Sequence, residues 1–470
     1  MKLKTALAAT ALIGVALVAN GAAQGPAPII SVGPNVQVST ARPTDTHYEV
    51  VISADPTDPS RLIAGSLVYP DTGTLVGTVV YNSSDGGAHW RPTLDLPALA
   101  RTGDPATAYG PDGTAYYVVS RIPAAGERQL LLFRSPDGGA RWDGPFAFTY
   151  MDREYVTVDA SNGRWRGRVY VSGNNRVPRT ISDFVLFSSA DNGSAFTGPV
   201  LRSDRRNETA SVMGNSAVSS DGTVVGVYVQ TPPSGTAPAV SSIHSIASRD
   251  GGASLTADVR VDAYVAGGER KGAIAGNANG EPALAVDATA GPLKDRLYMV
   301  WPDRRSGHSE IRFASSADAG RTWSASRIIS DTPESDTTDQ FMPEIAVNRD
   351  GVVGVTWYDR RDHSDNLGWD VRFAASFDGG ATFRPSVKVS ERGASFPVGT
   401  SRELRPRSTK PTEREQINSG RDSFRFMGGD TAGLAADAAG LFHAVWVDNH
   451  TGAPQVWTAT ISTGAARKTP

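Results

Sequence analysis

The 470-residue sequence contains no cysteine and only seven histidines. The absence of cysteine excludes disulfide bonds, thiolate metal sites and a cysteine that could carry a lipid. The histidines are scattered and include no His-x-x-x-His pair, so a zinc site is not expected. Beyond residue 18, no apolar run approaches the roughly eighteen residues that a membrane-spanning helix needs, and we expect no membrane span.

The sequence also lacks a strong excess of charge and long segments with helical periodicity. The formal net charge is −3, which gives no indication of a nucleic-acid partner or an anionic membrane. Short runs of strand-type residues alternate with turn residues, and the chain contains 49 glycines and 30 prolines. This pattern is typical of many short strands joined by turns, so the predicted fold class is all-β.

One short phrase, Ser-x-Asp-x-Gly-x-x followed by an aromatic or large apolar residue, occurs six times. The copies are Ser83–Trp90, Ser135–Trp142, Ser189–Phe196, Ser248–Leu255, Ser316–Trp323 and Ser376–Phe383. Their Asp residues are 52 to 68 positions apart, which is about the length of one four-stranded propeller blade with its turns. Within each copy, the carboxylate can bind nearby backbone N–H groups while Gly adopts the positive φ of a tight turn.

The spacing therefore predicts a β-propeller of four-stranded blades. Seven segments have the pattern of an inner strand, and the seventh, from Thr431 to Asp437, begins a unit without the phrase. We predict seven blades, with six as the alternative. An isolated strand at residues 35–39 resembles the outer strands, so we expect the N-terminal segment to complete the last blade and close the ring.

Residues 1–23 have the features of a secretory signal peptide. Lys2 and Lys4 precede an apolar run at residues 6–18, and small residues follow at positions 21–23. We therefore expect a secreted or periplasmic protein with a propeller domain at residues 24–463 and a disordered tail at residues 464–470. The mature chain is expected to be a monomer.

The repeated phrase resembles the Asp-box, or BNR, repeats of the sialidase (neuraminidase) superfamily, whose members are β-propellers. The resemblance covers most of the chain. It implies a glycoside hydrolase that acts on acidic glycans, of the exo-α-sialidase type, and that needs no cofactor. The family uses a Tyr nucleophile activated by Glu, an Asp as acid/base, and three Arg that hold the substrate carboxylate. The chain's Arg-Ile-Pro phrase, a family feature, lies at residues 121–123, away from its usual place before the first repeat.

The long loops and the first residues of the inner strands are expected on one face of the ring. The polar residues at these strand starts are Glu49, Asp104, Asp152, Arg153, Glu154, Glu281, Asp430 and Thr431. Converging carboxylates raise one another's pKa, as a general acid requires. They could equally bind Ca²⁺ or face the water of the channel, and both alternatives remain open.

A second pattern, Trp-x-Asp, ends three of the predicted second strands. It reads Trp301-Pro302-Asp303-Arg304-Arg305, Trp357-Tyr358-Asp359-Arg360-Arg361 and Trp446-Val447-Asp448. Arg side chains here could bind a substrate carboxylate through two parallel hydrogen bonds. The alternative is a structural clasp between Asp and Arg, with Trp packed between blades.

The resemblance assigns roles to particular residues of this chain. Asp104, Asp152 or Glu281 would be the acid/base, and Arg153, Arg304, Arg360 or Arg425 would hold the carboxylate. Tyr358, Tyr155 and Tyr48 are expected near the loop-rich face, with Tyr358 as the candidate nucleophile. The competing hypothesis is a non-catalytic propeller that binds a glycan or a protein. Three Arg converging beside a Tyr–Glu pair would favour the enzyme.

Overall fold

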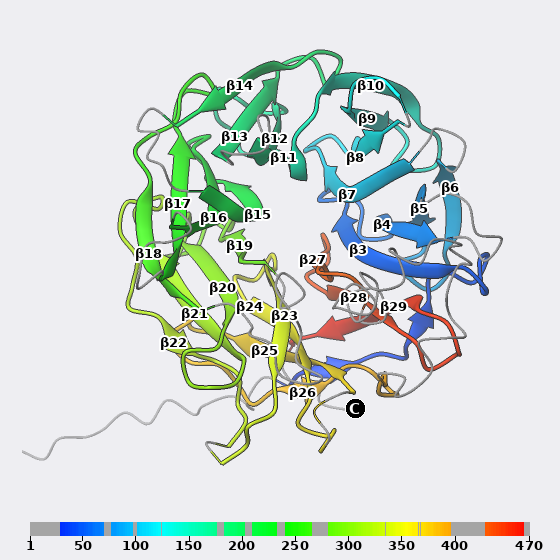
Figure 1. The fold of residues 1–470 in the computed structure, drawn as a ribbon, viewed down its shortest axis with the longest axis vertical. Coiled ribbons are helices and arrows are strands. Elements are labelled where there is room, and N and C mark those ends of the chain that lie inside the picture. The colour runs from blue at the N-terminus through cyan, green and yellow to red at the C-terminus, as the bar shows by residue number, and fades with distance from the viewer. Residues whose placement is uncertain are drawn as a thin grey trace, which may run out of the picture.

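The computed structural model describes residues 29–69, 77–96, 101–123, 125–175, 183–202, 209–232, 240–265, 281–333, 335–364, 366, 368–395 and 428–464. In these ranges, seven antiparallel sheets surround a central axis as the blades of a β-propeller (Figure 1). The predictions of an all-β fold and of seven blades are confirmed. Within the same ranges, no helix is long and apolar enough to cross a membrane.

Each of the first six blades contains four consecutive strands, the first of which lies innermost. Blades 1 to 3 comprise β3 (Thr46–Ala54), β4 (Leu62–Tyr69), β5 (Gly77–Ser83), β6 (Arg91–Asp95); β7 (Arg101–Tyr109), β8 (Ala115–Ile122), β9 (Gln129–Ser135), β10 (Asp143–Thr149); and β11 (Asp152–Val158), β12 (Val169–Asn175), β13 (Asp183–Ser189), β14 (Thr197–Leu201). Blades 4 to 6 comprise β15 (Thr209–Val218), β16 (Val224–Thr231), β17 (Ser241–Ser248), β18 (Val259–Tyr264); β19 (Ala283–Val286), β20 (Leu297–Asp303), β21 (Glu310–Ser316), β22 (Arg327–Ile328); and β23 (Gln340–Val347), β24 (Val353–Asp359), β25 (Asp370–Ser376), β26 (Val387–Lys388).

Blade 7 joins the two ends of the described chain. It comprises β27 (Gly433–Ala436), β28 (Phe442–Asp448) and β29 (Gln455–Ser462), and the N-terminal strands β1 (Ser31–Val32) and β2 (Val36–Gln37) pair with β29. The expected closure of the ring by the N-terminal segment is confirmed. The predicted signal peptide lies outside the described residues, as does the predicted tail apart from Gly464, whose carbonyl accepts a hydrogen bond from the Ile29 N–H.

All six Ser-x-Asp-x-Gly turns connect a third strand to a fourth strand and have the same hydrogen bonds. The Ser hydroxyl accepts a bond of 2.7–3.0 Å from the Gly N–H four residues later. The Asp carboxylate accepts a bond of 2.8–3.0 Å from the N–H four residues after it. These bonds satisfy backbone donors within the turn, so the repeats stabilise one face of the ring.

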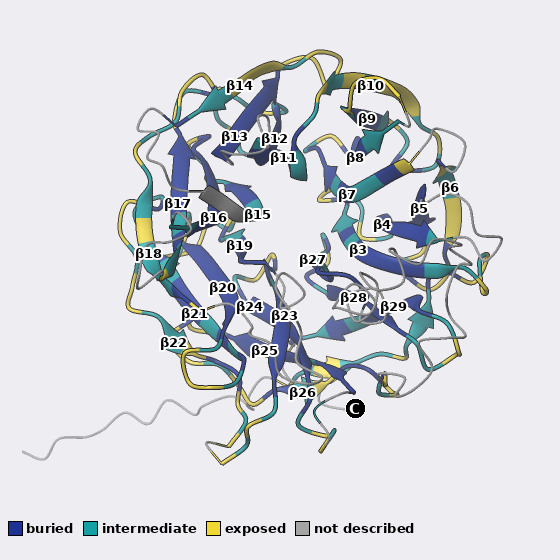
Figure 2. Ribbon diagram, viewed as in Figure 1, coloured by how far each residue is buried: buried dark blue, intermediate teal, exposed yellow. Residues whose placement is uncertain are grey.

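The hydrophobic core lies between the blades. Trp301, Trp357 and Trp446 are fully buried on β20, β24 and β28, and each packs against residues of the preceding blade. Burial of an aromatic side chain contributes about 1.5–3 kcal/mol. Exposed residues concentrate on the outer strands, as the yellow segments of β6 and β10 show in Figure 2. The scaffold is therefore a ring of rigid blades with polar groups gathered at its centre.

Candidate functional site

Three neighbouring inner strands carry a bulge at the same point, and a charged residue occupies each bulge. The pairing of β3, β7 and β11 with their second strands shifts register there. The residues involved are Glu49, Asp104 and Arg153, with φ values of 52°, 49° and 56°. Left-handed backbone at a residue other than glycine costs about 1–3 kcal/mol. Met342 has φ 49° at the corresponding bulge of β23, so the bulge belongs to the blade architecture, and blades 1 to 3 place a charged residue in it.

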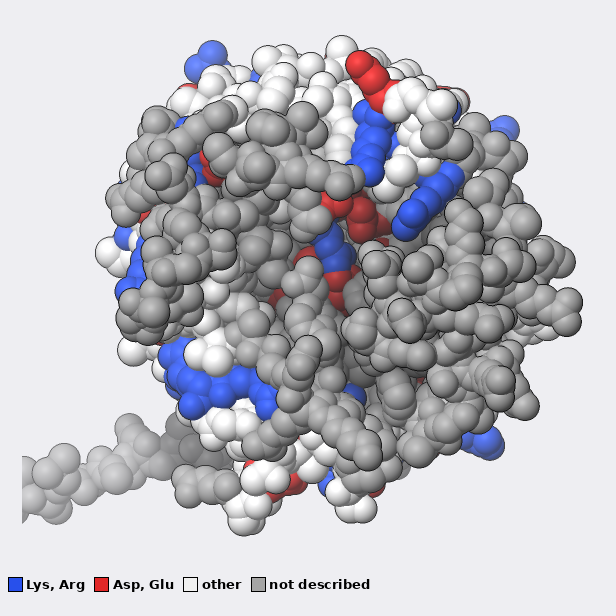
Figure 3. Space-filling view, viewed as in Figure 1, with Lys and Arg blue, Asp and Glu red and all other residues white. Residues whose placement is uncertain are grey.

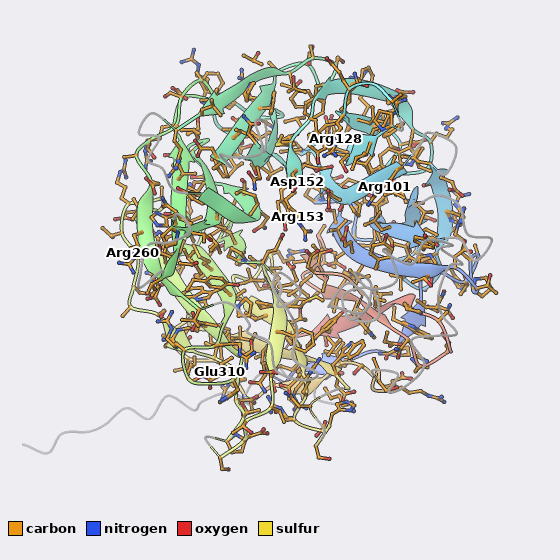
Figure 4. All side chains as sticks on the ribbon, in the orientation of Figure 1. Arg101, Arg128, Asp152, Arg153, Arg260 and Glu310 are labelled. Atoms are coloured by element: carbon orange, nitrogen blue, oxygen red, sulfur yellow. The ribbon has the colours of Figure 1, made fainter. Side chains whose placement is uncertain are left out.

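Arg153, on blade 3, lies among carboxylates contributed by three other blades. Its guanidinium is 3.3 Å from Glu281 Oε1 and 4.0 Å from Asp104 Oδ1, and it contacts the carboxylate of Asp430. The Arg153 side chain is 14% exposed, whereas Asp430 is fully buried. Figure 3 shows the result as red and blue atoms in the hollow at the middle of the ring, and Figure 4 labels Arg153 and Asp152 there.

Tyr155 and Glu281 form a direct pair within this group. The Tyr155 hydroxyl donates a hydrogen bond to Glu281 Oε2. Tyr155 lies two residues after Arg153, the left-handed residue of the β11 bulge, and Glu281 precedes β19. The bond therefore connects blade 3 to blade 5. The pair brings an ionisable hydroxyl next to a carboxylate that can accept its proton.

The pKa values of two glutamates of this group, Glu281 and Glu49, are shifted upward. Burial raises the pKa of Glu281 to about 7, Arg153 opposes the shift, and Asp104 adds to it. Burial, followed by the charge of Asp104, raises the pKa of Glu49 to about 8. A group with a pKa near 7 can both accept and donate a proton at neutral pH, as acid–base catalysis requires.

Two more glutamates extend this set. Burial raises the pKa of Glu154 and of Glu344 well above the usual value, with Asp104 contributing to the first shift and Glu281 to the second. Neither carboxyl oxygen of the buried Glu154 has a hydrogen-bond partner within the ranges that the structure describes. The upward shifts favour the protonated, uncharged form of both groups, which limits the repulsion among the carboxylates.

A cavity of about 340 Å³ runs through the ring beside these groups. Inner strands form its wall, and Tyr155, Glu281 and Glu344 are among the lining residues. A separate cavity of about 20 Å³ lies between Glu49, Asp104, Arg153 and Tyr155, large enough for a water molecule. The larger volume is within the lower range of ligand-binding pockets.

The structure places four of the eight predicted site residues together. Asp104 and Glu281 are paired with Arg153, and the charge of Asp152 contributes to the raised pKa of Glu49 and of Glu281. The Tyr150 hydroxyl donates a 3.0 Å hydrogen bond to Asp152 Oδ1. Arg425 lies outside the described residues.

The other three predicted residues are elsewhere. Tyr358 is buried between blades 6 and 7, where its hydroxyl accepts a 3.0 Å bond from the Val447 N–H. Arg304 follows β20 at the rim of its blade. Arg360 follows β24 and is buried, with its guanidinium 5.0 Å from the centre of the Phe341 ring. The positions of Tyr358 and Arg360 are therefore explained by packing rather than by the channel.

The Trp-x-Asp pattern forms the structural clasp. Asp303 binds Arg305 at 2.7 Å, and Asp359 binds Arg361 at 2.7 Å. In blade 7 the same position pairs Asp448 with His450 at 2.5 Å. The second Arg of each Asp-Arg-Arg phrase therefore makes the ion pair.

Some residues of the group were not predicted as site residues from the sequence. Glu49, Glu154 and Asp430 had been expected only as channel residues, and Glu344 had no expected role. Tyr155, rather than Tyr358, is the tyrosine beside a glutamate. The signal that could have identified Tyr155 and Glu344 is their shared position, since each follows the left-handed residue of its bulge by two.

Ca²⁺ is the alternative ligand that the sequence suggests for the carboxylates. Among the residues that the structure describes, no group of three or more Asp, Glu or His side chains is arranged to hold a metal ion.

Comparison with known proteins identifies the fold but no family. No protein-family model matches the sequence, and no curated protein matches it. A protein of unknown function from Dyadobacter fermentans is 12% identical, with a TM-score of 0.50, over 92% of this chain and 99% of the other. An α-L-arabinanase from Penicillium chrysogenum is 15% identical, with a TM-score of 0.44, over 70% and 94% of the two chains. A Hadza microbial sialidase is 13% identical, with a TM-score of 0.42, over 92% of each chain. At these identities, the likeness concerns the fold alone.

Proposed function

We propose that the protein is a glycoside hydrolase that acts on acidic glycans at the loop-rich end of the channel. The observation that carries the proposal is the hydrogen bond from the Tyr155 hydroxyl to Glu281 beside Arg153. In this proposal Tyr155 is the nucleophile and Glu281 is its base. A neutral nucleophile suits a substrate that carries a carboxylate next to the reacting carbon, because an anionic one would be repelled.

The reaction would proceed through a covalent intermediate. Glu281 takes the proton of Tyr155 while the phenolic oxygen forms a bond to the anomeric carbon. The glycosidic bond breaks, and a carboxylic acid gives a proton to the leaving oxygen. Asp104 and Asp152 are the acids expected from the sequence, and Glu49 is protonated at neutral pH because its pKa is about 8. Water then releases the sugar from Tyr155 and restores its proton.

The finer assignment within this proposal is an exo-α-sialidase. It is supported by the repeats, which resemble those of sialidases, and by a Tyr–Glu pair of the kind that sialidases use. The signal-peptide features of residues 1–23 support export of the protein to the periplasm or the medium. There the enzyme would meet extracellular glycans. No cofactor is part of the proposed reaction.

The second candidate is a propeller without catalytic activity that binds a glycan or a protein on the same face. The ion pairs of Arg153 favour it, because its guanidinium is already bound by Asp104, Glu281 and Asp430. An arginine held in this way has few donors left for a substrate carboxylate.

Hydrolysis of a fluorogenic sialoside and a fluorogenic uronide would test the proposal. The wild-type protein should turn over at least one of these substrates, and the Tyr155→Phe and Glu281→Gln variants should not. Tyr358→Phe is the matched control, since that ring lies between blades, and it should retain turnover. Turnover that survives Tyr155→Phe would reject this nucleophile. No turnover of either substrate by folded wild-type protein would favour the binding propeller.

A further inference from the structure

Two exposed arginines, Arg101 and Arg128, lie at the end of blade 2 where its inner strand begins. Arg101 is the first residue of β7, and Arg128 immediately precedes β9. Figure 4 labels both beside Asp152 and Arg153, whereas the labelled Arg260 and Glu310 are far from the centre. The proposed reaction uses neither arginine.

Strand register puts both arginines on the same side of the blade. Arg101 pairs with Ile122, and Arg128 precedes Gln129, which pairs with Arg121. Neighbouring strands are about 4.8 Å apart, so the two backbone positions are about 10 Å apart across β8. Arg121, the arginine of the Arg-Ile-Pro phrase, faces the other side, because it pairs with the buried Thr102 and its guanidinium contacts Gln129.

A side-chain contact connects Arg128 to the carboxylate group, and Arg101 is connected to it along β7. The Arg128 guanidinium is 5.4 Å from the centre of the Tyr150 ring, and Tyr150 donates to Asp152. Arg101 is three residues before Asp104 on β7. The carboxylates of the channel would repel an anionic group on a substrate, and Arg153 is bound to three of them. Positive charge that is open to a substrate therefore lies at Arg101 and Arg128.

We propose that Arg101 and Arg128 form a subsite for an anionic group, a carboxylate or a sulfate, on the glycan. Each guanidinium can bind such a group through two parallel hydrogen bonds. Binding there would place the neighbouring part of the sugar over the channel mouth, next to Tyr155. The subsite rests on the proposed function, since it assumes a glycan on this face.

Calorimetric titration of the Tyr155→Phe protein, in which turnover is blocked, tests the subsite directly. The probes are 3′-sialyllactose, 3′-sulfolactose and lactose, which separate a carboxylate from a sulfate and both from the neutral sugar. Replacing Arg101 and Arg128 together by Ala should weaken binding of one or both anionic sugars about tenfold, and higher salt should reduce that difference. Binding of lactose should be unchanged.

Arg260→Ala is the matched control, because Arg260 is an exposed arginine on the outer strand β18. It should bind all three sugars as the parent does. An equal loss for lactose, or no loss for either anionic sugar, would overturn the subsite. Failure of the Tyr155→Phe protein to bind either anionic sugar would also overturn the subsite. The catalytic pair is tested separately: it would still be supported if the wild-type protein hydrolysed a neutral glycoside and the Tyr155→Phe variant did not.

Discussion

Replacing Glu49 by Gln should remove a large part of the pH dependence of stability. Glu49 is 6% exposed, and its pKa rises from 4.5 to about 8 on folding because of burial and Asp104. The folded state then binds more protons than the unfolded state between these two values, so the free energy of unfolding falls as pH rises through that interval. The full difference corresponds to about 5 kcal/mol at about 1.36 kcal/mol per pKa unit.

We expect about half of this amount to be measured, because the effective dielectric constant of protein sites is high. Urea unfolding followed by tryptophan fluorescence between about pH 5 and pH 8 would measure it. The wild-type protein should lose about 2–3 kcal/mol more than Glu49→Gln over this range. Glu127→Gln, an exposed Glu-to-Gln control, should behave as wild type. Parallel pH curves for Glu49→Gln and the wild-type protein would refute the reasoning.

Two further predictions concern the base and the scaffold. If Glu281 is the base, kcat/KM should rise as pH increases through about 7, since the carboxylate form is needed, and a pH–rate profile without that limb would contradict its role. Gly380→Ala should lower the free energy of unfolding by about 2–4 kcal/mol, because φ is +82° and the new Cβ would meet the buried ring of Phe313. Gly452→Ala, at φ +102° in open space, should cost only about 1 kcal/mol, and equal melting temperatures for the two variants would contradict the packing argument.

The sequence predicted the fold in detail because the information was local and repeated. Each Ser-x-Asp-x-Gly turn closes with bonds among its own residues, as between Ser316, Asp318 and Gly320. The spacing of the turns then determined the blade length. Closure by residues 35–39 was predictable because that segment has the pattern of an outer strand, and β2 pairs with β29 as expected.

The candidate site was only partly predictable, because its geometry depends on bulges and on contacts between distant blades. Asp104, Asp152, Arg153 and Glu281 were found from their place at the starts of inner strands. The pairing of Tyr155 with Glu281 spans 126 positions and leaves no local trace in the sequence. Tyr358 was the candidate nucleophile because it was expected near the loop-rich face, but its ring is buried in the core between blades 6 and 7.

The most direct test of the account is the turnover of a fluorogenic sialoside by Tyr155→Phe compared with the wild-type protein. Tyr155→Phe removes one oxygen and keeps the ring that lines the channel. The account predicts that the wild-type protein turns the substrate over and that Tyr155→Phe, equally well folded, does not. If the wild-type protein is active and the Tyr155→Phe variant is equally active, the central role of the Tyr155–Glu281 pair is contradicted.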